Sequence, residues 1–454
     1  MKNSKFAIQT IGILFWLVYV FLGLDLIFNS KNSVQDIQFK FVSTLAVFVL
    51  ASYISWLFVN PKAGILLLQF WIFNSIFFIL APIAVISYPS SWFVNSSLDQ
   101  GSKIRAFYFV LGALLIAFIG SESSIKLVSK QNFNYRIDAK RFKSLFTIYV
   151  VLFLTLLVFR WRFIDNALVD YSSGQYFSPV SPMESGLMRA FLVAVPMIFV
   201  LCIIKLENQI SYFAKRMFLS LLLIILLIFA SPLGNSRQTF LLAFLPIIFA
   251  CLSENLVLRR LVTFIIFLVT VFGQPFSYAI THSAGKFRTE GLSGVFQSFN
   301  VKPSQILTSG DFDSFGMFAT GLDHLAWQSF EVPFSQFFGV FFYWIPRSLW
   351  SGKPQDTAVE IATLAGFSFQ NLSAPWLLEL LANGGFVLII VGAFLVPRLF
   401  KKLDQVSTTQ DFQWLLTYLL IGTEFILLRG SLLQASGVVI FGLVLSRLLV
   451  KRVE

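Results

Sequence analysis

Residues 341–385 read FFYWIPRSLWSGKPQDTAVEIATLAGFSFQNLSAPWLLELLANGG and join a polar segment to the start of an apolar run. Arg347 and Lys353 lie among aromatic residues, and Glu379 lies about one turn inside the apolar segment that begins near Pro375. A charge in hydrocarbon costs ~2.5–3.5 kcal/mol on insertion scales, so an ionisable residue in this position indicates a functional site. The alternative is structural, with Glu379 paired to a neighbouring helix.

Beyond this stretch, the composition predicts a polytopic membrane protein. The chain is 57% hydrophobic and 12% charged, well below the ~25% charged residues of a typical soluble domain. Its 454 residues suffice for about a dozen spans of ~20 residues each. The formal net charge of +12 is spread over short clusters between apolar runs. That pattern is typical of membrane orientation and argues against nucleic-acid binding.

Apolar runs of spanning length predict an all-α protein with about 12 transmembrane helices. They lie at 6–28, 41–59, 63–86, 106–125, 144–160, 187–204, 217–232, 239–253, 260–281, 376–397, 412–428 and 430–449. The first run follows Lys2 and Lys5 and has no small-residue cleavage site, so we interpret it as a span and not as a signal peptide.

Cations in alternate connections predict the topology. With the N-terminus inside, every inside connection is basic: Lys62; Lys126, Lys130, Arg136, Lys140, Arg141 and Lys143; Lys205, Lys215 and Arg216; Arg259 and Arg260; Arg398, Lys401 and Lys402; Arg447, Lys451 and Arg452. Both termini are therefore expected to be cytoplasmic. Arg237, in the turn PLGNSRQ, falls at the outer face, where topology does not require a cation.

The predicted organisation has three parts: spans 1–9 in residues 1–281, a long extracytoplasmic loop region in 282–375, and spans 10–12 in 376–454. The loop is rich in aromatic residues, so we expect it to be ordered. Its segment 332–350 is apolar but short, which predicts a re-entrant or interfacial helix. A second outer loop, 160–189, mixes aromatic residues with carboxylates and fits either sugar binding or an interfacial aromatic belt.

Metal and nucleotide chemistry have no sequence support. Cys202 and Cys251 lie inside apolar runs, and His282 and His324 are too few for a histidine-based metal site. The sequence has no phosphate-binding glycine loop, zinc motif or nucleophile elbow. We therefore expect no metal and no cofactor.

Two motifs resemble one family. The pattern IPRSLWSGKP at 345–354, followed by LLELLANGG at 377–385, and the turn GNSRQTFLL at 234–242 resemble the oligosaccharide repeat-unit polymerases, the O-antigen polymerase or Wzy type. The resemblance implies a GT-C-like, metal-independent glycosyltransferase in the bacterial cytoplasmic (inner) membrane. It would use undecaprenyl-diphosphate-linked glycans as donor and acceptor at the outer face. It also implies a chain-length regulator and a flippase as partners, besides the membrane lipids.

Metal-free cleavage of a glycosyl diphosphate requires cations for the leaving group and a carboxylate for the acceptor hydroxyl. The cations at predicted outer helix ends are Arg237, Arg347, Lys353 and Arg429. We expect these four to bind the diphosphate, with Arg347 also catalytic. Glu379 is the first choice as general base, and Asp311 and Asp313 are the second.

Each assignment has a structural alternative. Arg347 and Lys353 fit interfacial anchors beside Trp344 and Trp350. Arg429 fits a helix cap or a partner of Glu424. Asp311 and Asp313, in the sequence GDFD, fit loop formers.

Three functions are consistent with this pattern. The polymerase is the first. An O-antigen ligase-type glycosyltransferase shares the layout, and a catalytic histidine in the loop, His282 or His324, would favour it. A transporter or lipid-glycan flippase would concentrate charges and broken helices near the bilayer midplane, where the predicted spans carry few charges.

Overall fold

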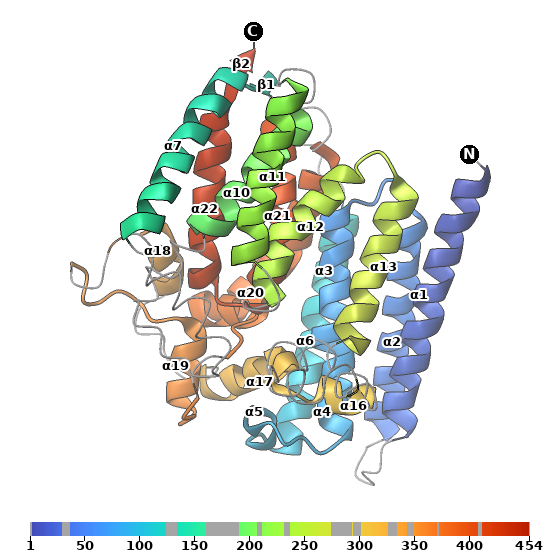
Figure 1. Ribbon diagram of the computed structural model, residues 1–454. Coiled ribbons are helices and arrows are strands. Elements are labelled where there is room, and N and C mark those ends of the chain that lie inside the picture. Colours follow the sequence, from blue (N-terminus) through green and yellow to red (C-terminus); the bar gives the residue numbers. More distant parts are fainter. Residues whose placement is uncertain are drawn as a thin grey trace.

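The computed structural model describes residues 2–29, 37–123, 134–159, 190–206, 211–230, 237–273, 293, 301–325, 334–342, 345, 349–369, 372–406 and 411–453. These residues form an α-helical bundle with one short two-stranded sheet (Figure 1). The sheet pairs β1 (Asn134–Ile137) antiparallel with β2 (Val450–Val453). The predicted loop 160–189 and most of 274–300 lie outside the described residues.

The first half of the chain contributes most of the long helices. They are α1 (Lys2–Phe28), α2 (Ile37–Val59), α3 (Ile65–Ser75), the π-helix η1 (Ile76–Leu80), α4 (Ala81–Ser87), α5 (Phe93–Ser96), α6 (Gln100–Glu122), α7 (Ala139–Phe159), the π-helix η2 (Ala190–Ala194), α10 (Val195–Lys205), α11 (Tyr212–Phe229), α12 (Arg237–Cys251) and α13 (Leu256–Phe272).

The second half begins with short helices and ends with three long ones. The short ones are α16 (Pro303–Leu307), the 3₁₀ turn η4 (Gly310–Phe312), α17 (Ser314–Leu325), α18 (Ser335–Phe341) and α19 (Thr357–Leu364). The long ones are α20 (Trp376–Val406), α21 (Asp411–Arg429) and α22 (Leu432–Leu449). Segment 332–350, for which a short helix was predicted, contains α18.

Seven helical segments of the described chain are long and apolar enough to cross a membrane. They are Ser4–Phe28, Ile37–Val59, Ile65–Ser87, Gln100–Glu122, Tyr212–Phe229, Trp376–Gln405 and Asp411–Arg429. The predicted polytopic membrane protein is thus confirmed, and each of the twelve predicted runs overlaps a helix. A count of twelve spans and a GT-C-like fold stay predictions.

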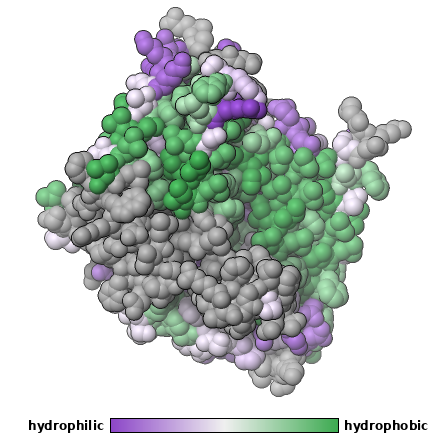
Figure 2. All heavy atoms as spheres, in the orientation of Figure 1, coloured by the Kyte–Doolittle hydropathy of each residue, from purple (hydrophilic) through white to green (hydrophobic). Residues whose placement is uncertain are grey.

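The helical surface is apolar, as lipid contact requires. Large hydrophobic side chains stand exposed along the outer helices, for example Phe21, Phe41, Val158, Phe213 and Val387. In Figure 2 hydrophobic residues cover the middle of the coloured surface, and hydrophilic residues lie toward its two ends, among them the end that holds the C-terminus. The segment Ile65–Ser87, by contrast, is buried throughout its most apolar window, so it forms the centre of the bundle.

Both termini lie at one end of the bundle (Figure 1), which we call the basic end. It also contains β1, β2 and the connections at Lys62, Arg260 and Lys401. Arg260 donates from Nη2 to the Ala63 oxygen (2.6 Å), and Lys401 donates to the Ser121 oxygen. The short helices α5, α16, α17 and α19 lie at the opposite end, the loop end. This agrees with the predicted alternation of connections, while the cytoplasmic location of the termini stays a prediction.

Helix α20 is sharply bent near the loop end. Gly384 and Gly385 have non-helical backbone angles, and Gly385 has φ 60° and ψ −153°. The bend brings the Leu380 side chain against Gly392, where an added Cβ would lie 2.5 Å from a Leu380 methyl carbon. In a straight helix these residues would be ~18 Å apart. Glu379 therefore belongs to a short first segment of α20, before the bend.

We expect Gly385→Ala to destabilise the protein by ~1–3 kcal/mol, because the conformation of Gly385 is open almost only to glycine. Gly112→Ala is a matched control, since Gly112 lies within α6 and has open space where a Cβ would stand. It should stabilise by ~0.5–1 kcal/mol. The measurement is thermal unfolding of the full chain in detergent. Equal effects of the two substitutions would contradict the bend.

Candidate functional site

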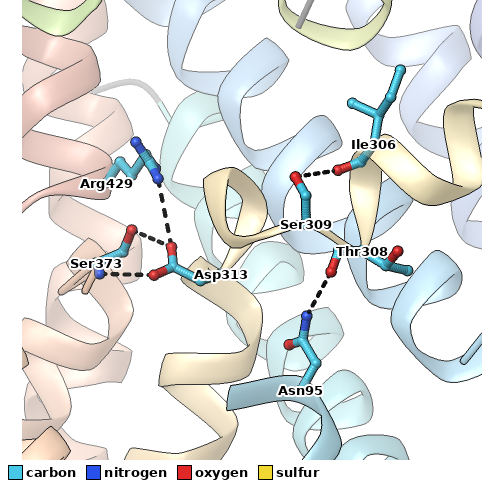
Figure 3. Close-up of polar contacts among 7 residues, drawn as sticks. All are labelled: Asn95, Ile306, Thr308, Ser309, Asp313, Ser373 and Arg429. Carbon is cyan, nitrogen blue, oxygen red and sulfur yellow. Dashed lines mark hydrogen bonds and ion pairs between the residues drawn. The ribbon is translucent and has the colours of Figure 1, made fainter. Parts of the chain in front are cut away.

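The loop end contains a buried ion pair between Arg429 and Asp313 (Figure 3). Arg429 is the last residue of α21, and Asp313 directly precedes α17. Arg429 Nη2 lies 3.6 Å from Asp313 Oδ1. Ser373 completes the group: its backbone N–H donates to Asp313 Oδ2 at 3.1 Å, and its hydroxyl donates to Oδ1. The three residues tie the loop region, the start of α20 and the end of α21 together.

The surroundings of Asp313 have opposing effects on the pKa of its carboxyl group. Burial raises the pKa, whereas the Arg429 charge and the two hydrogen bonds from Ser373 lower it. Asp311 adds a smaller upward contribution. The net result is a pKa above the ordinary aspartate value, because burial has the largest effect.

Arg429 retains binding capacity beyond this pair. Its Nε is buried and has no hydrogen-bond partner, and 16% of its side chain is exposed. The guanidinium lies over the Phe77 ring, with Cζ 6.0 Å from the ring centroid. Phe77 in turn stacks on Phe312, with centroids 5.1 Å apart. A guanidinium has five N–H donors in a planar fork, so Arg429 can bind an oxyanion while Asp313 holds one side of it.

Polar contacts hold the segment that presents Asp313. The Thr308 carbonyl accepts from Asn95 Nδ2 at 3.3 Å, and the Ser309 hydroxyl donates to the Ile306 carbonyl (Figure 3). The Thr308 carbonyl also accepts from the Ser90 hydroxyl at 2.8 Å. Gly310 packs against the Trp92 ring, where a Cβ would lie 2.9 Å from ring atoms. The turn is thus held by the segment around α5, and Asp313 is fixed in place.

Glu379 joins three helices. Its Oε2 accepts from the Thr357 hydroxyl at 2.8 Å, and its Oε1 accepts from the Leu432 N–H at 2.9 Å. The side chain is only 4% exposed. Each carboxylate oxygen is engaged, and the Leu432 N–H is the first unpaired donor of α22. This geometry fits the structural alternative for Glu379 better than the general-base role.

The other predicted residues have varied positions. Lys353 is 7% exposed, and its Nζ donates to the Ile345 carbonyl at 2.9 Å, so the ammonium bonds to the loop backbone. Asp311 lies partly buried in η4, two residues from Asp313. Arg347 and the side chain of Arg237 lie outside the described residues.

The turn between α21 and α22 therefore gathers three of the predicted site residues. Asp313 holds Arg429 on one side of the turn, and Glu379 holds Leu432 on the other. The suggested pairing of Arg429 with Glu424 was wrong, because the ion-pair partner of Arg429 is Asp313. Glu424 lies five residues earlier on α21, which is ~7.5 Å along the axis.

The sequence analysis did not identify Ser373 and Thr357 as hydrogen-bond donors to the buried carboxylates, or Glu424 as a buried acid without a partner. Ser373 and Thr357 are ordinary loop and helix-start residues, and nothing in their neighbourhood marks them as carboxylate donors. Glu424 had a signal, namely a carboxylate well inside an apolar run. It was considered only as a partner of Arg429, yet it is 2% exposed and both of its oxygens lack a hydrogen-bond partner.

Within the described part of the chain, no three His, Cys, Asp or Glu residues are grouped so as to hold a metal ion. A search against protein-family models, curated proteins and solved structures finds no match to this chain.

We expect Asp313→Asn to destabilise the protein by about 3 kcal/mol, because it leaves Arg429 with an uncompensated, largely buried charge. Asp311→Asn is the matched control and should change stability much less, because Asp311 is less buried than Asp313 and its removal does not leave Arg429 without its ion-pair partner. Chemical unfolding of the purified chain in detergent measures both. A destabilisation shared equally by the two variants would argue against the ion pair.

The raised pKa of Asp313 also predicts a pH dependence. The Asp313 carboxyl group binds a proton more tightly in the folded chain than in the unfolded chain, so the protonated group stabilises the fold. This contribution to the free energy of unfolding is complete below the unfolded pKa of about 4 and is lost as the pH rises through the folded pKa. Arg429→Gln removes a cation that lowers the pKa, so the loss should extend to higher pH. Unfolding temperatures between about pH 4 and about pH 8 measure this. Parallel profiles of Arg429→Gln and the intact chain would contradict it.

Proposed function

We propose that this protein is a membrane glycosyltransferase that joins undecaprenyl-diphosphate-linked oligosaccharide repeat units into a surface polysaccharide. The observation that carries the proposal is Arg429, whose side chain is oriented by Asp313 and remains 16% exposed at the loop end of an apolar bundle. The diphosphate of a lipid-linked glycan lies where a membrane helix ends, and Arg429 stands at such an end. The resemblance in residues 345–354 and 377–385 supports the same reaction.

In the proposed reaction the acceptor hydroxyl attacks the anomeric carbon of the donor glycan. The bond between that carbon and the diphosphate oxygen breaks, and a new glycosidic bond forms. Arg429 stabilises the negative charge that develops on the departing diphosphate. Asp313 and Ser373 orient the guanidinium, so the cation is in place before the reaction. Arg347, Lys353 and Arg237 remain further candidates for the diphosphate.

The acceptor proton requires a carboxylate as general base. Asp311 now fits better than Glu379, since Asp311 is partly exposed beside Asp313 while both oxygens of Glu379 accept structural hydrogen bonds. The reaction as proposed takes place at the outer face of the bacterial cytoplasmic membrane, with the loop end facing out. A chain-length regulator and a flippase would be its partners.

The test is polysaccharide profiling in the native host after deletion of the gene and complementation. Intact protein should restore a ladder of long chains, and Arg429→Ala should reduce polymer formation by ~10²–10³-fold, the cost of removing one donor to a developing oxyanion. Arg429→Lys should fall between the two, because lysine keeps the charge but loses the planar fork. The control is Arg447→Ala at the basic end, which should keep the ladder.

Membrane levels of every variant are measured alongside, so a folding defect is recognised. A deletion that leaves surface glycan of one repeat unit supports the polymerase. Full-length polymer that stays on its lipid carrier would indicate the ligase instead. A ladder unchanged in Arg429→Ala would remove Arg429 from the mechanism.

A transporter or lipid-glycan flippase is the second candidate, and two observations favour it. Glu424 is a buried carboxylate without a partner inside a spanning helix, and α20 is broken at Gly384 and Gly385. Transporters combine intramembrane charges with interrupted helices. For this candidate, the deletion should cause lipid-linked units to accumulate inside the cell with none at the surface.

A further inference from the structure

Glu424 is a buried carboxyl group that the proposed glycosyl transfer does not use. It lies within α21 and is 2% exposed. Both carboxylate oxygens are inaccessible to solvent and accept no hydrogen bond. Other acids within the bundle differ: the partly buried Asp404 accepts from the Leu66 and Leu67 N–H groups, and the buried Glu379 accepts from Thr357 and Leu432.

The surroundings of Glu424 belong to the interior of the bundle. Thr417 lies seven residues earlier and so on the same face of α21. Its hydroxyl donates to the Leu403 carbonyl of α20 at 3.4 Å, which shows that this face is turned toward α20. Phe425, the residue after Glu424, contacts Phe73 of α3 and Phe77 of η1, with ring centroids 5.6 Å apart in both cases.

Charged and titratable groups on the helices packed around α21 have other positions or partners. Helix α3 contains none. Arg429 pairs with Asp313, and Lys205 of α10 pairs with Asp411 at the other end of α21 (3.8 Å). The remaining ones are Arg237 and Cys251 on α12, Glu379, Arg398, Lys401, Lys402 and Asp404 on α20, Arg447 on α22, Cys202 on α10, Tyr418 on α21, and Tyr135 and Arg136 on β1. No ion pair or hydrogen bond joins any described side chain among them to Glu424.

An ionised carboxylate in such a place would be very costly, because a charge in a low-dielectric interior needs a counter-ion or hydrogen-bond donors. The neutral acid avoids most of that cost. We propose that Glu424 is a reversible proton-binding site within the bundle. Its carboxylate takes one proton from hydronium, leaving water, and the arrangement described here holds the neutral acid.

Release of the proton requires a polar partner or water to reach the carboxyl group. The helices that enclose Glu424 have breaks that permit a rearrangement. Helix α20 is bent at Gly384 and Gly385, and the buried segment Ile65–Ser87 contains the π-helix η1, which includes Phe77. Bends and π-helical segments are places where helices adjust locally, and π-helical ones are frequent at functional sites. The proton site is independent of the glycosyl transfer proposed above.

The first experiment measures proton binding through stability, on the full chain in detergent. Between about pH 6 and about pH 8, above the ordinary glutamate pKa, the unfolding equilibrium constant of the intact chain should rise about tenfold per pH unit relative to Glu424→Gln. The matched control is Glu122→Gln, which removes an exposed carboxyl at the end of α6. Intact chain and Glu122→Gln should have the same slope.

The second experiment detects the neutral acid directly. A hydrophobic carbodiimide reacts with protonated carboxyl groups in apolar surroundings, and mass spectrometry locates the adduct. We expect an adduct at Glu424 that is at least tenfold more abundant at acidic than at alkaline pH and that is absent from Glu424→Gln. Parallel pH profiles of the intact chain and Glu424→Gln in the first experiment would overturn the proposal, whether or not the carbodiimide reaches the site. An adduct with equal abundance at both pH values would overturn its reversibility.

Discussion

The architecture depends on α20, which carries a carboxylate near each end. Each of these carboxylates accepts hydrogen bonds from the first turn of another helix. Glu379 accepts the Leu432 N–H at the start of α22, and Asp404 accepts the Leu66 and Leu67 N–H groups at the start of α3. Helix N-termini have unpaired donors and a partial positive charge, so an acid from a neighbouring helix satisfies both. Gly64 is part of this contact, since a Cβ there would collide with Asp404.

These contacts explain how an apolar bundle obtains a defined arrangement. Apolar helices in lipid gain little from hydrophobic burial against one another, so packing and polar contacts must select the neighbours. The central helix α3 is held by Asp404 at the basic end, and its neighbour Trp376 bonds to Asn74 through the indole N–H at 3.2 Å. Some of the described polar side chains in the spans join helices: the Ser55 hydroxyl donates to the Gly12 carbonyl at 2.9 Å, and the Trp71 indole N–H donates to the Ser121 hydroxyl at 3.2 Å.

Cationic side chains make different contacts at the loop end and at the basic end. Cations at the basic end largely contact backbone carbonyls or remain at the surface, as Arg260 and Lys401 illustrate. At the loop end, Arg429 is embedded among aromatic rings and paired with an acid from a distant part of the chain. A cation fixed in this way is oriented before any ligand arrives, as the proposed binding of a diphosphate would require. Glu424 lies five residues earlier in the same helix and accepts no hydrogen bond, so α21 carries both of these unusual ionisable residues.

The sequence by itself determined the membrane-embedded α-helical class, the approximate positions of the helices and the collection of cationic connections at one end. Hydrophobic runs and cation distribution are local properties, so they can be read along the chain. It also identified Arg429, Asp313 and Glu379 as unusual. Only the tertiary structure decided their partners, because Asp313–Arg429, Ser373–Asp313 and Glu379–Leu432 join residues far apart in sequence. The bend in α20 and the isolation of Glu424 likewise depend on packing between helices, which no local pattern encodes.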